Sequence, residues 1–192
     1  MIGGAVGEAL SYLINLVFGF LLLAVALRFL LAWVRADFYN PVSQFIVTIT
    51  NPMLRPLRRV IPGYAGVDWP ALVLMLALKM TELAILGLIV AGRVPAFPGL
   101  LTLGFAEILS LVIYIFMFAI LIQVILSWVN PGAYNPATVL IYRLTEPLMR
   151  PARRLLPPLA GLDFSPVIVI VLLQLSVILI VRPLIRAGLS LS

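Results

Sequence analysis

Two stretches of 36 residues, 95 positions apart, decide the fold of this chain. Residues 33–68 read WVRADFYNPVSQFIVTITNPMLRPLRRVIPGYAGVD, and residues 128–163 read WVNPGAYNPATVLIYRLTEPLMRPARRLLPPLAGLD. When the two stretches are aligned without a gap, about 16 of the 36 positions are identical. A repeat of this kind predicts that one structural unit occurs twice in the chain.

Long apolar runs flank both copies. They cover about residues 9–34, 70–90, 104–129 and 166–185 of a chain that is 64% hydrophobic and 10% charged, with a mean hydropathy of +1.20. Runs of about 20 apolar residues cross the hydrocarbon core as helices, which satisfy their own backbone hydrogen bonds in lipid. The sequence therefore predicts an all-α membrane protein with four transmembrane helices in two parallel tandem repeats. Residues 1–192 form a single membrane domain, with repeat 1 at about 8–92 and repeat 2 at about 104–187.

The number of spans and the positive charges predict an orientation. Each repeat has two spans, so both copies enter the membrane in the same direction, unlike the inverted repeats of many transporters. Eight of the 13 lysines and arginines lie in the two repeated stretches. By the positive-inside rule, these stretches face the cytoplasm and both termini lie outside.

Each repeated stretch predicts a short amphipathic helix at the membrane surface. Asn40 is a good N-cap, and the apolar residues of 41–49 recur at helical spacing; Asn135 begins the same device in the second copy. Asp68 and Asp163 stand just before the next spans, where a carboxylate meets the positive end of a helix dipole. Pairing between arginine and aspartate is expected to fix the element.

Prolines farther along each stretch predict a second, separate turn of helix. A kinked or single-turn helix is expected to start at Thr50 or Asn51 in the first copy and at Thr145 or Glu146 in the second. The reason is that proline inside a helix removes a hydrogen bond and clashes with the preceding turn. The prolines concerned are Pro52, Pro56, Pro147 and Pro151.

Six arginines recur at equivalent positions, and they allow two interpretations. They could act only as topology signals, or they could bind the phosphate groups of anionic phospholipid or an acidic membrane-protein partner. The recurrence of their spacing supports binding, whereas the apolar residues around them argue against nucleic acid. The six candidate binding residues are Arg55, Arg58, Arg59, Arg150, Arg153 and Arg154.

Polar side chains inside the spans also allow two interpretations. Lys79 and Glu82 are three residues apart, on one helix face, where they can form an ion pair. The polar set could line an ion path between the repeats, or it could make structural contacts that hold the spans together. Its members are Arg28, Lys79, Glu82, Gln123 and Gln174, with Glu107 as a further charge.

The composition argues against catalysis. The chain has no cysteine and no histidine, so disulfides, thiolate chemistry and the usual zinc and haem ligands are absent from the sequence. No serine triad or glycine-rich phosphate loop is present either. We expect no metal, no cofactor and no enzymatic activity.

The doubled motif resembles the bacterial YggT family, which is called YlmG in Gram-positive bacteria and plastids. The resemblance rests on Trp, Asn-Pro, Thr-x-Pro-x-x-x-Pro-x-Arg-Arg-x-x-Pro and Gly-x-Asp, found within residues 33–68 and again within 128–163. It implies a small multi-pass protein of the bacterial inner membrane with no established enzymatic activity, linked to tolerance of osmotic stress. For plastid relatives, the resemblance implies a role in thylakoid biogenesis and cytochrome complex assembly. For Gram-positive bacteria, it implies a neighbourhood with cell-division factors.

The expected function combines the resemblance with the residues. It is a non-enzymatic protein that supports membrane-protein assembly or membrane integrity, acts as a homo-oligomer, and contacts lipid or another membrane protein complex. The alternative is a small ion channel or transporter with a path between the repeats or at an oligomer axis. Convergence of the in-span polar residues on one water-filled cavity would favour the alternative.

Overall fold

The computed structural model describes residues 4–64, 66–129, 135–155 and 163–192. Four helical stretches are long and apolar enough to cross a membrane, which confirms the predicted spans. They are α1 (Ala5–Trp33), α3 (Trp69–Ala91), α4 (Phe97–Val129), and a fourth stretch made of α6 (Ser165–Ser176), the π-helical segment η1 (Val177–Val181) and α7 (Arg182–Ser190). The π-helical segment comes just before Pro183, which has no N–H to donate to a regular helical turn.

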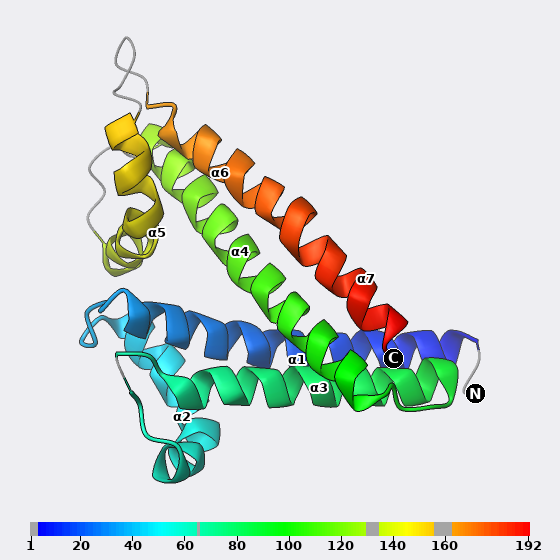
Figure 1. The fold of residues 1–192 in the computed structure, drawn as a ribbon. Helices are drawn as coiled ribbons and strands as arrows, with labels where there is room; N and C mark the ends of the chain where they lie inside the picture. The colour runs from blue at the N-terminus through cyan, green and yellow to red at the C-terminus, as the bar shows by residue number, and fades with distance from the viewer. Residues whose placement is uncertain (1–3, 65, 130–134, 156–162) are drawn as a thin grey trace.

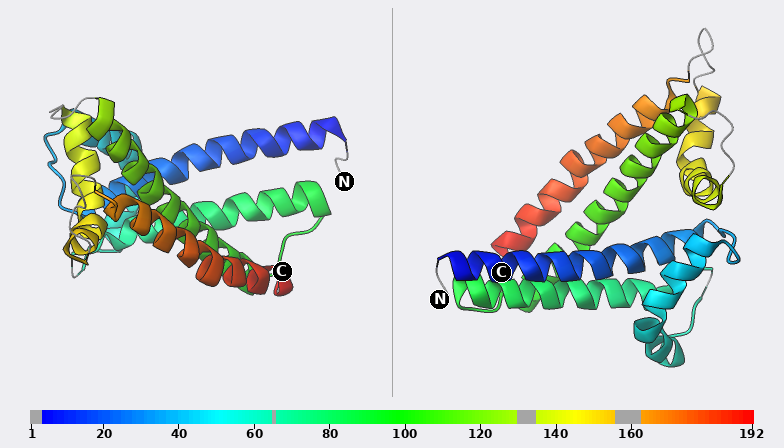
Figure 2. Two further views of the ribbon diagram at one scale, coloured as in Figure 1. Left: turned by 90° about the horizontal axis from the view of Figure 1, so that it is seen from above. Right: turned by 180° about the vertical axis from the view of Figure 1, so that it is seen from behind.

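The four spans form two antiparallel hairpins that cross obliquely. Figure 1 shows α1 beside α3, and α4 beside the stretch from α6 to α7. The first hairpin leads into the second through Gly92, which ends α3 with a φ of +69°, a backbone conformation that glycine adopts readily. Both termini lie at the same end of the molecule, and α2 and α5 lie at the other end (Figures 1 and 2).

Buried apolar side chains join the two hairpins. The largest cluster contains Val25 of α1, Met75 of α3 and Phe116 of α4. The ring of Phe116 also meets Trp33 edge to face, with centroids 6.4 Å apart. Near the termini, α7 approaches α4 so closely at Gly188 that a Cβ there would lie 2.7 Å from the side chain of Leu103.

In each repeat, one shorter helix connects the two spans. These helices are α2 (Pro41–Val60) and α5 (Pro136–Leu155), each of 20 residues and each with a strong division into apolar and polar faces. The amphipathic element predicted between the spans is therefore confirmed. The prediction of a second, separate helix starting near Pro52 and Pro147 is wrong, because each helix continues through both of its internal prolines.

Packing explains why the prolines do not end these helices. Pro52 and Pro56 are four residues apart, so they share one face of α2, and both are exposed. The opposite side carries Leu54, which is fully buried in the main core cluster. Burial of such a side chain stabilises the fold by about 2 kcal/mol, which helps offset the hydrogen bonds that the prolines remove.

Asn40 caps α2 and also joins the two repeats. Its side-chain oxygen accepts a hydrogen bond from the N–H of Val42 at 2.9 Å, and its side-chain nitrogen donates to the carbonyl of Pro136 at 2.7 Å. In α5, Asn135 and Thr138 form a reciprocal cap in which each side-chain oxygen accepts from the other's backbone N–H. Both predicted asparagine caps are therefore present.

Replacing Asn40 with alanine should lower the free energy of unfolding by about 1–2 kcal/mol, because one cap and one partly buried hydrogen bond between the repeats are lost. Asn40→Ser should lower the free energy of unfolding by less, since serine can cap the helix but is too short to reach Pro136. Denaturant titration in detergent micelles measures both values. Equal losses for the two variants would contradict the proposed contribution of the contact between repeats.

Candidate functional site

The six predicted arginines lie on the second halves of α2 and α5, and all six side chains are exposed. Because α2 and α5 lie at the same end of the molecule, the fold brings both clusters to that end (Figure 1). We call this end, formed by α2, α5, Asp68 and Asp163, the arginine end. It combines positive charge with apolar side chains that anchor the helices.

One arginine of each cluster is neutralised by an aspartate. Arg58 forms an ion pair with Asp68, and Arg153 forms one with Asp163 at 3.1 Å. Arg153 also lies 3.6 Å from Glu146. The pairing between arginine and aspartate that the sequence predicts is thus present in both repeats, where it ties each short helix to the start of the next span.

Asp163 is held in its charged form. Partial burial raises the pKa of this carboxyl, but hydrogen bonds from Ser165 and Arg153 outweigh burial and leave the pKa below its ordinary value. A lowered pKa in the folded state means that the contact contributes stability above the ordinary pKa of an aspartate. That contribution is lost as the pH falls through the lowered value.

The other four arginines have no partner of this kind. All seven acidic residues of the sequence lie in the described part of the chain, and there none of them pairs with these four guanidinium groups. The side chains also make no hydrogen bond to any described residue. They are Arg55, Arg59, Arg150 and Arg154.

Two polar residues inside the spans hold the short helices in place. Arg28 of α1 donates through Nη1 to three acceptors on α2, at 3.0, 2.9 and 3.0 Å: the carbonyl of Val47, the hydroxyl of Thr50 and the side-chain oxygen of Asn51. At the positions 95 residues later, Gln123 of α4 accepts a hydrogen bond from Thr145 of α5. The same tie therefore occurs in both repeats, with an arginine in one and a glutamine in the other.

The partners of Arg28 and Gln123 include two threonines that the sequence pattern did not predict. Both threonine hydroxyls are buried, and Thr50 and Thr145 are themselves related by the 95-residue shift. A search for polar residues that recur in pairs under this shift would have found them.

The charged residues in the middle of the spans form a separate network. Nζ of Lys79 lies 2.8 Å from Glu82 on the same helix and 2.6 Å from Glu107 on α4. The pair between Lys79 and Glu82 is as predicted, whereas Glu107 was not recognised as a partner. The network joins the two hairpins, because α3 and α4 belong to different repeats.

The second repeat has no equivalent of this network. In repeat 2, Gln174 and Val177 occupy the positions equivalent to Lys79 and Glu82. In repeat 1, Tyr12 occupies the position equivalent to Glu107 of repeat 2. Gln174 is half-buried and makes no side-chain hydrogen bond to a described residue. The predicted in-span residues thus occur in separate contacts and do not form one polar cluster.

The CCB3/YggT family model matches the chain twice, over residues 7–89 and 102–184. The chain belongs to the CCB3/YggT family. The two matches start 95 residues apart, so each YggT unit comprises one hairpin together with its arginine-bearing helix. This agrees with the tandem repeat and the fold predicted from the sequence.

Relatives from other bacteria resemble the chain over most of its length. "Uncharacterized protein PA0392" of Pseudomonas aeruginosa is 43% identical over 185 residues, which cover 96% of this chain and 93% of that protein. "Uncharacterized protein YggT" of Escherichia coli is 35% identical over 166 residues, or 86% of each chain. No solved structure matches the chain.

A shorter relative matches one part of the chain. "Uncharacterized protein ycf19" of Guillardia theta is 36% identical over 61 residues, which cover 31% of this chain and 67% of that protein. The names of these relatives assign them no role. The comparisons and the fold together show a multi-pass membrane protein of the YggT family with bacterial homologues.

Proposed function

We propose that this YggT-family protein is a non-enzymatic factor of the bacterial inner membrane that supports membrane-protein assembly or membrane integrity, including tolerance of osmotic stress. Its arginine end faces the cytoplasm and contacts anionic phospholipid or another membrane protein. The observation that carries the proposal is a set of four exposed arginines on two equivalent helices, none of which forms an ion pair or side-chain hydrogen bond with a described residue. These are Arg55, Arg59, Arg150 and Arg154.

The structure around these arginines favours binding over a topology signal alone. A topology signal needs positive charge near a span but no fixed geometry. Here the charges lie on helices anchored by Leu54 and Met149, two equivalent side chains that are fully buried. Anchored guanidinium groups bind phosphate or carboxylate in a bidentate manner, which an ammonium group cannot do. The homo-oligomer expected from the sequence stays a prediction.

The separate polar contacts support this proposal over an ion channel. Arg28 is bound to α2, Gln123 to α5, and Lys79 to two carboxylates, so all the predicted in-span groups except Gln174 have local partners among the described residues. Polar groups satisfied in this way stabilise contacts between helices. They do not supply a continuous row of ligands for a moving ion.

The test compares two variants of the four unpaired arginines. Changing all four to alanine should abolish rescue of osmotic-stress growth in a strain deleted for its own YggT-family gene. It should also weaken binding of the purified protein to an anionic partner or lipid. Changing all four to lysine keeps the charge but removes bidentate binding, so we expect partial rescue.

A matched control lies at the other end of the molecule. Arg93→Ala, Arg182→Ala and Arg186→Ala remove exposed positive charges near the termini and should leave rescue unchanged. Reporter fusions at both termini check that every variant inserts with the same orientation. Full rescue by a correctly inserted alanine variant would disprove the proposal. Full rescue by the lysine variant, with none by the alanine variant, would show that the four positions need positive charge but not bidentate binding.

A further inference from the structure

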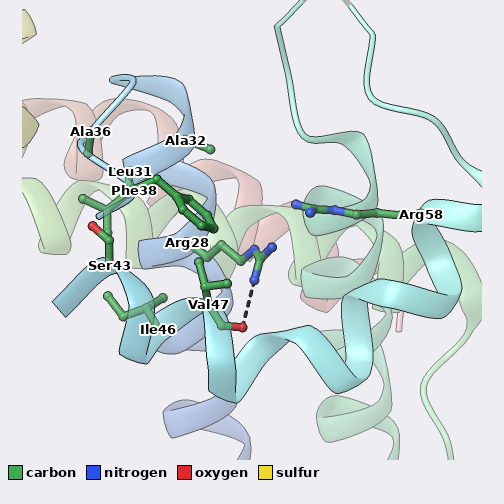
Figure 3. A pocket seen from close by; sticks show the side chains of 9 residues that line it. All are labelled: Arg28, Leu31, Ala32, Ala36, Phe38, Ser43, Ile46, Val47 and Arg58. Carbon is green, nitrogen blue, oxygen red and sulfur yellow. Dashed lines mark hydrogen bonds between the residues drawn. The ribbon is translucent and has the colours of Figure 1, made fainter. Parts of the chain in front are cut away.

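We propose that a cavity in the first repeat binds an anionic phospholipid, with Arg28 and Arg58 as cationic ligands of its phosphate and Ser43 as a hydrogen-bond donor to another part of the lipid. This inference rests on the proposed function, and it names the ligand and one binding site at the arginine end. Figure 3 shows the guanidinium groups of Arg28, from α1, and Arg58, from α2, extending toward each other across the cavity.

The cavity is large enough for a phosphate and leads from the surface to a buried charge. Its volume is about 140 Å³, well above the roughly 10–15 Å³ that one water molecule needs. Phe38 and Arg58, which are exposed, line its outer part, while Arg28 and Ser43 are only 6% and 5% exposed. A ligand entering between the exposed residues would therefore meet a desolvated guanidinium group.

Among the described residues, one carboxylate faces the two guanidinium groups of the cavity, so a positive charge remains. Nη1 of Arg28 donates to three uncharged acceptors, and its Nε and Nη2 atoms make no hydrogen bond to a described residue. Arg58 lines the same cavity, but its carboxylate partner Asp68 balances only one of the two guanidinium groups. A buried, unneutralised cation is costly, so an anion bound there would be strongly favoured.

Ser43 provides an independent indication of a ligand. Its Oγ is buried and has no hydrogen-bond partner among the described residues, although buried hydroxyl groups are usually bonded. Ser43 lines the cavity together with Arg28. A phospholipid in the cavity would offer its phosphate to the free guanidinium donors and a further oxygen, such as an ester carbonyl, to the hydroxyl of Ser43.

The other walls of the cavity favour a lipid over free phosphate. They include Leu31, Ile46, Val47 and Phe38, which offer apolar surface to the glycerol and acyl portions of a lipid. Arg28 lies five residues before the end of α1, or about 7.5 Å along the helix, so it is close to the depth of lipid headgroups. Both sources share the phosphate group, and the experiment below separates them.

The second repeat contains a natural comparison for this site. Gln123 replaces Arg28 and is bonded to Thr145, and Thr138 replaces Ser43 and takes part in the cap of α5. These two described positions therefore provide neither a buried cation nor an unbonded hydroxyl. Arg28→Gln copies this arrangement into repeat 1, and glutamine can keep the tie to Thr50.

The experiment titrates the full-length purified protein by native mass spectrometry with three probes: short-chain phosphatidylglycerol, diacylglycerol with the same chains, and inorganic phosphate. Arg28→Gln should weaken phosphatidylglycerol binding at least tenfold, about the effect of one charge-assisted hydrogen bond. Ser43→Ala, which keeps every bond of Arg28, should weaken it about threefold. Diacylglycerol should bind all three proteins equally weakly.

Three results would overturn the inference. Unchanged phosphatidylglycerol binding in both variants would show that the cavity is not the site. Inorganic phosphate that binds as tightly as phosphatidylglycerol would show that the ligand is free phosphate. Loss of binding only when Arg55, Arg59, Arg150 and Arg154 are changed would reject this cavity while supporting the proposed function. Thermal unfolding of each variant verifies that it is folded.

Discussion

Lys79→Ala should lower the free energy of unfolding by about 3–5 kcal/mol, the usual cost of removing one partner from a buried ion pair. Lys79 is the only cation in contact with Glu82 and Glu107 in the described chain. The side chain of Glu82 is 3% exposed, so water cannot replace the missing ammonium group. The loss should also loosen the contact between α3 and α4, which joins the two hairpins.

The second repeat suggests the control for this variant. A triple variant with Lys79→Gln, Glu82→Val and Glu107→Gln removes all the charges together and gives the first two positions the residues of repeat 2. It should be far more stable than Lys79→Ala, because replacing a whole buried network is often neutral. Unfolding by SDS titration in mixed micelles measures both; a triple variant as unstable as the single one would refute the explanation.

Leu54→Ala and Met149→Ala should each lower the free energy of unfolding by about 2–5 kcal/mol. The two residues occupy equivalent positions on α2 and α5, and both have 0% exposure. Each side chain anchors its helix to the spans, so truncation leaves a void beneath the arginine end. Limited proteolysis should then cut α2 or α5 faster than in the unchanged protein.

Exposed apolar residues on the same helices provide controls for these two variants. Val60 is 81% exposed and Leu155 is 82% exposed. Changing either to alanine should alter stability by less than about 0.5 kcal/mol. If Val60→Ala destabilised the protein as much as Leu54→Ala, loss of apolar surface to the membrane, and not packing, would explain the result.

The repeat made much of the fold predictable. Patterns that recur 95 residues apart identified the spans, the caps at Asn40 and Asn135, and the pairing of arginine with Asp68 and Asp163. These features depend on residues close together in sequence, where helical spacing and dipole arguments apply. The doubled occurrence also made coincidence improbable.

Features set by contacts between distant helices were harder to predict. Glu107 meets Lys79 only because α3 packs against α4, which helical spacing within one span does not reveal. The continuous course of α2 through Pro52 was missed for a similar reason, since it depends on the buried contacts of Leu54. The six arginines looked alike in sequence, and only the ion pairs separated two of them from the four that have no partner among the described residues.

The difference between Arg28 and Gln123 shows what covalent fusion of the two YggT units makes possible. In a pair of separate, identical subunits, any substitution would appear in both, so a charged cavity would always occur twice. A fused chain can acquire Arg28 in one unit and retain a neutral glutamine in the other. The ion network of Lys79 is likewise confined to one of two equivalent places. Joining the halves in one polypeptide thus lets each specialise without changing its partner.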